Sequence, residues 1–368
     1  MKLLFTKFFF FLQYLKSKKY LQMEESPDSP GKILLIMCKW IGDTFWDLQG
    51  IPALQKQFPN AEIHVITKPF SKFLFVHLLP ESQIHVSTQI LSDCRRETFH
   101  LKTWKQELAL AESIQPDLLI DFTETPFSAV FSALCGAKSI AGYDHLGRFS
   151  NLYTFRVHAE YGLHLSRRPM QLYLPFLGYE PEFPQTVPAV PHPAAPGADI
   201  IIFPGTGWKT KEYPAEKYHQ IAKILSEKGF SICVAGSRKE KMLCETVADG
   251  LKNVRIQCGS PEEMLEHLAS AKVCLSGDTG PAHLAAAMGL FTVTLFCGTN
   301  PEFCGPRGKN VLSLCASCPD APEGKTQFCP ADRRFACERT CFMNIEQDKV
   351  LSAILKKLPE LNASRSQD

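Results

Sequence analysis

The fold of this chain is decided by the stretch KVCLSGDTGPAHLAAAMGLFTVTLF, residues 272–296. Its two ends, KVCLS (272–276) and FTVTLF (291–296), are short apolar runs of the kind that form strands buried on both faces of a parallel sheet. Between them an Asp and a Thr precede Pro281 and an alanine-rich run, which is the residue order at a helix start. The stretch therefore predicts a strand, a helix and a second parallel strand.

The same alternation of apolar runs and amphipathic stretches continues on both sides of this unit. Helix-like segments lie at 51–58, at 104–113 and from Ala215 onward, where apolar residues recur at helical spacing. This βαβ rhythm predicts an α/β protein with doubly wound parallel sheets. The further predicted strands are KILLIMC (32–38), EIHVI (62–66), QIHV (83–86), DLLID (117–121), DIIIFP (199–204), FSICVAG (230–236) and VRIQ (254–257).

A length of 368 residues predicts about two domains. The proline-rich run PEFPQTVPAVPHPAAPG (181–197) can hold neither a helix nor a central strand, so we interpret it as the linker between them. Ligands of such folds bind at the carboxyl ends of the strands, which predicts a crevice between the domains. The predicted division is an N-terminal extension (1–30), a first domain (31–180), the linker, a second domain (198–345) with a Cys-rich segment (297–341), and a C-terminal helix and tail (346–368).

The composition narrows the class of protein. With 45% hydrophobic and 21% charged residues the chain is globular, and a formal charge of +2 gives no general electrostatic basis for binding nucleic acid. Many of its 14 cysteines are scattered, several of them within apolar runs, which is typical of a reducing, cytoplasmic location.

The N-terminal extension leaves two interpretations open. Residues 1–25 are rich in Phe, Leu and Lys, but the longest apolar run, Phe8–Leu12, is far too short to span a membrane. Residues 1–22 could form an interfacial helix on an anionic membrane. Alternatively they are a solvated extension, or translation starts at Met23.

Two motifs of the second domain could hold an anion. The loop Gly205–Pro214 (GTGWKTKEYP) follows a strand and offers backbone amides, hydroxyls and lysines, although an ordinary polar loop would look similar. It lacks the order of a P-loop or of a dinucleotide-binding turn. The segment Ser276–Gly289 places a helix N-terminus at the same edge, where free amides would face a diphosphate.

Two acidic residues also stand at predicted strand ends. Asp43 follows the first strand, where a carboxylate could act as a general base or cap a helix. Glu240 follows the second strand of the second domain, where it could accept hydrogen bonds from ribose or simply be solvated.

From about Gly31 onward, these motifs in this order resemble glycosyltransferase family 9, the ADP-heptose:lipopolysaccharide heptosyltransferases. The most specific part is GDTGPAHLAAAMGLFTVTLFCGTNPEFCGP (277–306), and PGTGWKTKEYP and IGD are similar to the family's phosphate loop and N-terminal signature. The resemblance implies a GT-B architecture of two Rossmann-like domains, of which the first binds the acceptor and the second binds the nucleotide sugar. It also implies inverting transfer of heptose or a similar sugar, without a metal ion or other cofactor. The donor would be ADP-heptose and the acceptor a lipopolysaccharide core or other lipid-linked oligosaccharide at the cytoplasmic face of the inner membrane.

The resemblance also implies roles for single residues. Asp43 would take the proton from the acceptor hydroxyl, and Lys211 would stabilise the charge that develops on the diphosphate. Glu240 would hold the ribose, and Asp278 would fix the loop or touch the sugar. The implied nucleotide-sugar-binding residues are Thr206, Gly207, Lys211, Glu240, Asp278, Thr279, Gly280 and His283.

Two departures from the family pattern concern specificity. The chain has Asp47-Leu48-Gln49 where the family usually has T-x-P, and Trp46 replaces a smaller residue, so we expect an altered wall facing the acceptor. Gly207 stands where many members carry Ser or Thr, so the donor could differ from ADP-heptose.

Three alternatives remain open at this point. The chain could use another nucleotide sugar or be a nucleotide-sugar 2-epimerase. It could instead be a catalytically silent nucleotide-sugar-binding scaffold. A structural zinc site in the Cys-rich segment is disfavoured because the intervals are irregular; its candidate ligands are Cys315, Cys318, Cys329, Cys337 and Cys341.

Overall fold

The computed structural model describes residues 29–90, 98–160, 162–181, 197–208, 211–316 and 340–365. The chain divides into two compact units, residues 1–184 and 185–368, each of which we describe by itself. The N-terminal extension and most of the proline-rich linker lie outside the described residues. Within the described ranges, no helix is both long and apolar enough to cross a membrane.

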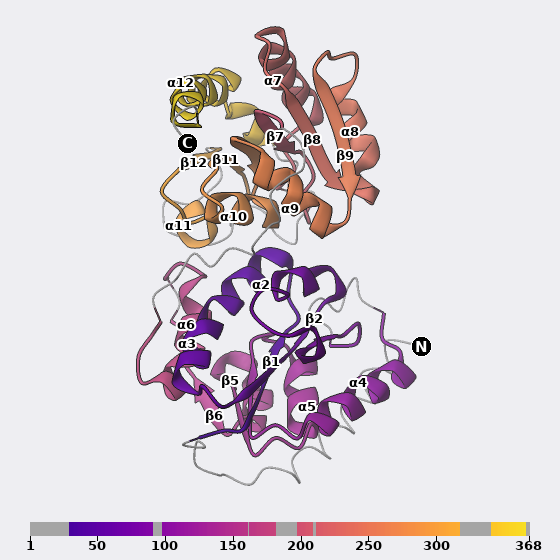
Figure 1. Ribbon diagram of the computed structural model, residues 1–368, viewed down its shortest axis with the longest axis vertical. Coiled ribbons are helices and arrows are strands. Elements are labelled where there is room, and N and C mark those ends of the chain that lie inside the picture. The colour runs from indigo at the N-terminus through magenta and orange to yellow at the C-terminus, as the bar shows by residue number, and fades with distance from the viewer. Residues whose placement is uncertain are drawn as a thin grey trace. The chain divides into compact units, whose positions relative to one another are not determined.

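The first unit, drawn from indigo to magenta in Figure 1, is built on a parallel sheet. The sheet has six strands in the order β3-β2-β1-β4-β5-β6. Its central strand reads KILLIM and is buried along almost its whole length, as expected of a strand covered on both faces. The strands are β1 (Lys32–Met37), β2 (Glu62–Thr67), β3 (Ile84–Val86), β4 (Leu118–Asp121), β5 (Ser139–Tyr143) and β6 (Phe155–Val157).

Helices cover both faces of this sheet. Leu34 and Ile36 of β1 join a core cluster with Trp104 of α4 and Phe131 of α5, whereas α3 packs against α6. The helices are α2 (Ile41–Asp47), α3 (Ile51–Gln57), α4 (Leu101–Ile114), α5 (Pro126–Leu134) and α6 (Arg167–Leu177), with 3₁₀ helices η1 (Leu48–Gly50), η2 (Pro69–Leu74), η3 (Glu81–Gln83) and η4 (Asp144–Leu152).

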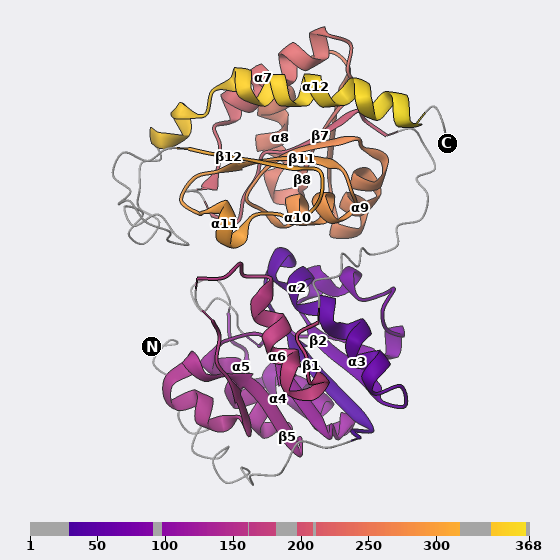
Figure 2. The ribbon, with the colours of Figure 1, turned by 90° about the vertical axis from the view of Figure 1, so that its left-hand side faces the viewer.

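The second unit repeats the design, with the strand order β12-β11-β10-β7-β8-β9, again all parallel. In this unit, Figure 2 shows α7 and α12 on one side of the sheet and α9 and α10 on the other. The strands are β7 (Ile200–Phe203), β8 (Ile232–Ser237), β9 (Val254–Gly259), β10 (Val273–Gly277), β11 (Phe291–Phe296) and β12 (Val311–Cys315).

The helices of the second unit bury their apolar stripes in one core. Tyr218 and Ile221 of α7 meet Ile354 and Leu358 of α12 over the buried β7. The helices are α7 (Ala215–Glu227), α8 (Lys241–Ala248), α9 (Pro261–Ser270), α10 (Gly280–Ala287), α11 (Pro301–Cys304) and α12 (Gln347–Arg365), with 3₁₀ helices η6 (Arg238–Glu240) and η8 (Thr340–Asn344).

The predicted fold class, an α/β chain with two Rossmann-like parallel sheets, is confirmed. Every predicted strand is present within one or two residues of its predicted bounds. Three strands were not predicted from the sequence: β5 and β6, on one side of the first sheet, and β12, at one edge of the second. The first two are short or contain Gly and Ser, and β12 (VLSLC) is only partly buried.

Candidate functional site

Both sheets have a topological switch point, where neighbouring strands lead to helices on opposite faces. In the first unit this point lies between β1 and β4, and in the second between β7 and β10. The carboxyl ends of the strands at a switch point leave room for a ligand in doubly wound sheets. The residues that follow β1, β4, β7 and β10 are therefore the candidates to examine.

Asp43 lies just beyond the carboxyl end of β1, in the first turn of α2. It is not the capping residue, because the helix begins after Trp40, whose carbonyl accepts from the Thr44 amide at 2.8 Å. Its side chain is partly exposed, whereas the residues from Thr44 to Asp47 are buried. The structure thus leaves Asp43 accessible at the switch point, as a general base requires.

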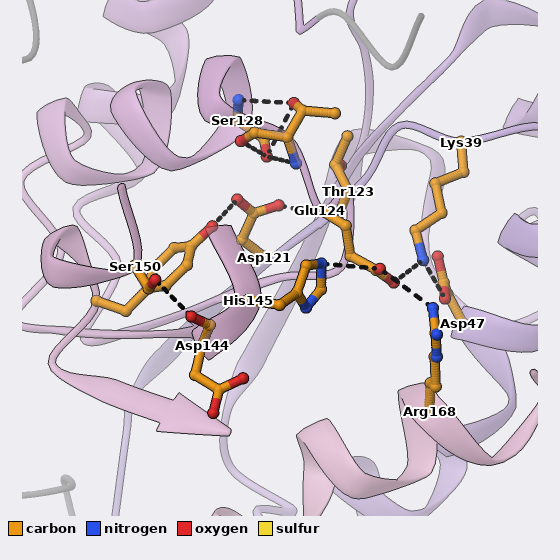
Figure 3. A network of polar contacts seen from close by, with 12 residues as sticks. Lys39, Asp47, Asp121, Thr123, Glu124, Ser128, Asp144, His145, Ser150 and Arg168 are labelled. Atoms are coloured by element: carbon orange, nitrogen blue, oxygen red, sulfur yellow. Dashed lines mark hydrogen bonds and ion pairs between the residues drawn. The ribbon is translucent and has the colours of Figure 1, made fainter. Parts of the chain in front are cut away.

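A network of charged side chains lies beside this turn (Figure 3). The Lys39 ammonium is 3.2 Å from Asp47 Oδ1 and 2.9 Å from Glu124 Oε1. The other oxygen of Glu124 is 3.5 Å from His145 Nε2 and 3.8 Å from Arg168 Nη1. These residues come from the end of β1, from α2, from the loop after β4, and from η4 and α6.

Burial sets the protonation states in this network. Burial raises the pKa of Asp47 to about 8, although Lys39 opposes the shift. Burial alone would lower the pKa of Lys39, but the charges of Glu124 and Asp43, together with that of Asp47 when it is ionised, outweigh it and raise that pKa above its ordinary value. Burial also disfavours the charged form of Glu124, yet Lys39 and its other cationic neighbours hold its pKa below the usual range. Lys39 and Glu124 are therefore the firmly charged pair, and Asp47 retains a proton near neutral pH.

Asp121, the last residue of β4, is a second buried carboxyl at this end of the sheet. It accepts hydrogen bonds from the Thr123 amide at 2.9 Å and from the Tyr153 hydroxyl at 2.8 Å. Burial raises its pKa to about 6. Its partners are internal, so we assign Asp121 to holding the β4–α5 loop that carries Glu124.

The departure from the family pattern at residues 46–49 lies inside the first unit. Trp46 is 5% exposed and packs edge-on against His164, and Asp47, Leu48 and Gln49 are at most 1% exposed. The Tyr173 hydroxyl of α6 donates to the Asp47 carbonyl at 2.7 Å. The expectation that these residues form a wall facing the acceptor was therefore wrong: they belong to α2 and η1, and these two elements pack against α6.

In the second unit the candidate residues gather between β7 and β10. The Lys211 ammonium lies 2.6 Å from Asp278 Oδ2, and the Thr299 hydroxyl donates to the same oxygen at 2.8 Å. The ammonium also lies 4.6 Å from the centre of the Trp208 ring. Asp278 is 7% exposed, and these contacts offset the cost of burying its carboxyl group.

The glycine-rich loop after β7 approaches the end of β10 closely. A Cβ placed on Gly277 would lie 3.1 Å from Thr206 Cγ2 and 3.3 Å from the Lys211 carbonyl. The Thr206 hydroxyl donates to the Trp208 carbonyl at 2.6 Å. The absence of a side chain at Gly277 thus lets the loop lie beside the start of α10.

The helix α10 begins after Thr279 and has Pro281 in its first turn. Thr279 makes no side-chain capping bond; its hydroxyl instead lies 2.9 Å from Ser276 Oγ. His283 is 5% exposed, and its Nε2 lies 3.9 Å from Asp278 Oδ1. The first turn, including Gly280, presents the positive end of the helix dipole beside Lys211 and Asp278.

Two predicted residues remain, Glu240 and Gly207. Glu240 forms a capping box, since its Oε2 accepts from the Ser237 amide at 2.7 Å, and its carboxylate covers Gly205. Its role toward ribose stays a prediction. Gly207 has open space around its Cβ position and no positive φ, so the glycine is not required by the backbone.

The zinc alternative gains no support from the described residues. Cys318, Cys329 and Cys337 lie outside them, so that part of the hypothesis is not addressed. Within the described ranges, no group of three or more His, Cys, Asp or Glu side chains is placed to hold a metal ion. Cys341 instead lies 2.8 Å, sulfur to sulfur, from Cys297 at the end of β11.

Several residues of these sites were not predicted from the sequence. They are Lys39, Glu124, His145 and Arg168. A usable signal existed for Glu124, because a parallel order with β4 beside β1 brings the loop after DLLID next to Asp43. Thr299 could have been found in the same way, since β11 pairs with β10.

Comparisons with known proteins identify the family. A family model described as glycosyltransferase family 9 (heptosyltransferase) matches residues 109–330, which is more than half of the chain. Lipopolysaccharide heptosyltransferase 1 of Pseudomonas aeruginosa is 26% identical over 343 residues, covering 89% of this chain and 92% of that protein.

Solved structures agree on the fold. The Escherichia coli heptosyltransferase WaaC with ADP superposes with a TM-score of 0.67 at 21% identity, over 88% of this chain and 99% of that one. A family 9 glycosyltransferase from Veillonella parvula gives a TM-score of 0.72 at 14% identity, over 92% and 100% of the two chains. With two parallel sheets, candidate groups at both switch points and a family model that matches more than half of the chain, this chain belongs to glycosyltransferase family 9.

Proposed function

We propose that this protein is an inverting heptosyltransferase that moves heptose from ADP-heptose to a lipopolysaccharide core acceptor without a metal ion. The observation that carries the proposal is the pairing of Lys211 with Asp278 beside the first turn of α10, within the matched family segment. A cation, a helix N-terminus and a glycine-rich loop form an anion site suited to a nucleoside diphosphate. The curated relative is named a lipopolysaccharide heptosyltransferase, and the WaaC structure is described with ADP.

In the proposed reaction, Asp43 accepts the proton of an acceptor hydroxyl while that oxygen attacks the anomeric carbon of the sugar. The bond from the anomeric carbon to the diphosphate oxygen breaks, and the configuration inverts. Negative charge then grows on the diphosphate, where Lys211 and the amides of the α10 first turn stabilise it. Because Lys211 pairs with Asp278 in this structure, the diphosphate must compete for the ammonium, and Thr299 remains as a donor to Asp278.

The first experiment is a thermal-shift panel of ADP, UDP, GDP and dTDP sugars on the full chain without added metal. A ligand that binds only the folded state at 100 times its Kd stabilises it by about 2.7 kcal/mol. We expect a selective shift with ADP-heptose, followed by transfer to a core acceptor that persists in EDTA. Asp43→Asn should lower turnover by about 10²- to 10⁴-fold while keeping the thermal shift.

Other outcomes of the same panel favour the alternatives. A preference for another nucleotide would keep the glycosyltransferase and replace the donor, a result that Gly207 makes worth testing. Conversion of the nucleotide sugar without any acceptor would indicate an epimerase. Selective binding with a wild-type protein that never turns over would indicate a scaffold.

We also propose that residues 1–22 bring the enzyme to the cytoplasmic face of the inner membrane, where a lipid-linked acceptor resides. Five lysines among Phe and Leu residues support this, since basic and aromatic side chains favour an anionic interface. Deleting residues 1–22 should weaken sedimentation with phosphatidylglycerol vesicles, while binding to neutral phosphatidylcholine vesicles stays low. Equal sedimentation of both proteins would rule out this contact.

A further inference from the structure

Lys39, Asp43 and Asp47 share one corner of the first unit. Asp43 and Asp47 stand four residues apart in α2, so their side chains project from the same face of the helix, roughly 5–6 Å apart at Cβ. The Lys39 ammonium reaches that face from the end of β1, because it lies 3.2 Å from Asp47 Oδ1. The cation is therefore placed beside the helix turn that carries the proposed base.

Lys39 is held in this position from its other side by Glu124. The 2.9 Å ion pair joins the end of β1 to the loop after β4, and Glu124 adopts a left-handed backbone conformation with a φ of 61°. A non-glycine residue in that region is strained, and such strain persists only where the surroundings enforce it. His145 and Arg168 contact the second oxygen of Glu124 and so hold its carboxylate in place. The carboxylate in turn holds the Lys39 ammonium.

Lys39 carries a positive charge that is coupled electrostatically to Asp43. Burial keeps a proton on Asp47 near neutral pH, and Glu124 faces the ammonium from the opposite side. The negative charge of Asp43 is one of the causes that raise the pKa of Lys39, and such a coupling is reciprocal. The ionisable groups around Lys39 and α2 include Asp43 and Asp47 of α2, Asp121 of β4, Glu124 of the following loop, Tyr143 of β5, His145 of η4, Arg168 and Tyr173 of α6, and Lys68 and Lys72 at η2, which packs against α2.

We propose that Lys39 is a positioning residue for glycosyl transfer, whose ammonium, clamped between Asp47 and Glu124, holds Asp43 in the ionised, proton-accepting state. This inference rests on the proposed function, in which Asp43 is the base. Lys39 touches neither substrate in this role; it acts through Asp43. Asp47 and Glu124 serve to hold the cation, which explains why a buried and a partly buried carboxyl group lie beside the base.

The test is the pH profile of kcat/KM for three variants of the full-length enzyme. On the acid side of this profile, the acid limb, kcat/KM rises with pH as Asp43 loses its proton. Lys39→Met removes the cation and so favours the proton on Asp43, which should move the acid limb to a higher pH by about one unit. At a given pH on that limb, kcat/KM should fall roughly tenfold. Lys39→Arg restores a cation and should return the limb toward its wild-type position. Asp47→Asn removes the carboxyl group that contacts the ammonium but keeps the cation, so its limb should stay in place or move down.

A merely structural role gives a different pattern. Loss of packing would lower kcat/KM at every pH and would affect Lys39→Met and Asp47→Asn alike. Two results would overturn the inference. One is a Lys39→Met enzyme whose acid limb lies at the same pH as that of the wild type, and the other is an acid limb that moves equally in Lys39→Met and Asp47→Asn. If Lys39→Met fails to fold, Lys39→Gln keeps a donor for Glu124 without the charge and must show the same upward shift.

Asp43→Asn separates this inference from the function on which it rests. Turnover retained in Asp43→Asn would overturn the base assignment and this inference together. If Asp43→Asn loses turnover but the acid limb of Lys39→Met stays at the wild-type pH, only the role of Lys39 is overturned. The thermal shift with ADP-heptose reports on the second unit and should be unchanged in all these variants.

Discussion

At the scale of single residues, the buried carboxyl groups of the first unit carry the clearest physical consequences. Asp47 has one oxygen on Lys39 and a second, buried oxygen without a hydrogen-bond partner among the described residues. Such an atom is costly to ionise, because water cannot reach it and only one cation offsets its charge. Asp47 therefore couples the stability of the first unit to pH.

Asp47→Asn should make the stability of the first unit less sensitive to pH. The wild-type carboxyl keeps its proton up to about pH 8 in the folded state but ionises near pH 3.8 when unfolded, so the folded state binds more protons between these values. Stability therefore falls as pH rises, by up to about 1.4 kcal/mol per pH unit for one such group. Urea unfolding at several pH values between 6 and 8 measures this change of the unfolding free energy with pH. The range is chosen because Asp121, whose pKa is raised to about 6, contributes mainly below it.

Asp117→Asn is the matched control for that measurement. Its pKa is lowered by a hydrogen bond from Lys138, so its contribution is lost only as pH falls into the acid range. Between pH 6 and 8 this variant should keep the wild-type slope. An Asp47→Asn protein with the wild-type slope would show that Asp47 is ionised in the folded unit.

Lys211→Met should lower transfer by about 10²- to 10³-fold, which is the usual effect of removing one group that stabilises developing charge. The substitution also leaves Asp278 with Thr299 as its remaining hydrogen-bond donor of 3.5 Å or less among the described contacts. Lys239→Met, at an exposed lysine after β8, is the control and should retain turnover within about twofold. Steady-state kinetics with ADP-heptose measures both, and equal activities would exclude Lys211 from the diphosphate site.

At the scale of elements, the contact between the loop after β7 and the end of β10 is decided by glycine. Gly277 admits Thr206 and the Lys211 backbone, whereas nothing lies within 4 Å of a Cβ on Gly207. Both glycines lack a positive φ, so alanine is compatible with either backbone. Comparing alanine at Gly277 with alanine at Gly207 therefore distinguishes the effect of crowding between elements from a general effect of substitution in this site.

Gly277→Ala should weaken ADP binding, because the loop must shift by a few tenths of an ångström from the α10 first turn. We expect a loss of affinity of about three- to tenfold, equivalent to roughly 0.7–1.4 kcal/mol. Gly207→Ala should bind ADP within about twofold of wild type. Isothermal titration calorimetry measures both, and a tighter or unchanged Gly277→Ala complex would contradict the assigned contact.

The elements also show where sequence reasoning succeeded and failed. Strands such as KILLIM and IIIF were predictable because central parallel strands are uniformly apolar. The outer strand β6 has three residues, and β12 is only partly buried, so neither carries that signal. Asp43, Lys211 and Asp278 were found from their places after strands and from motif order, although their proposed roles await the experiments above.

At the scale of the whole molecule, two units with the same strand order have different polar groups at their switch points. The first unit places carboxyl groups and Lys39 at its switch point, and the second places Lys211, Asp278 and a helix N-terminus there. The proposed division is that the second unit binds the nucleotide sugar and the first supplies the base.

Hydrogen exchange of the full chain with and without ADP tests this division. We expect slower exchange in the loop 205–208 and at the start of α10, since ligand binding suppresses local opening of the backbone that it contacts. Peptides from β1, α2 and the β4–α5 loop should exchange as in the free protein. Protection confined to the first unit would reverse the assignment.

The sequence by itself determined the fold class, because apolar periodicity and turn residues are local properties of the chain. It also placed the glycine-rich loop and the segment 277–289 at strand ends. Only the tertiary structure decided that Lys39 lies between Asp47 and Glu124, and that Lys211 pairs with Asp278, since these partners are 8, 85 and 67 residues apart. Burial, which gives Asp47 its raised pKa and places residues 46–49 in the interior, likewise depends on helices that pack from distant parts of the chain.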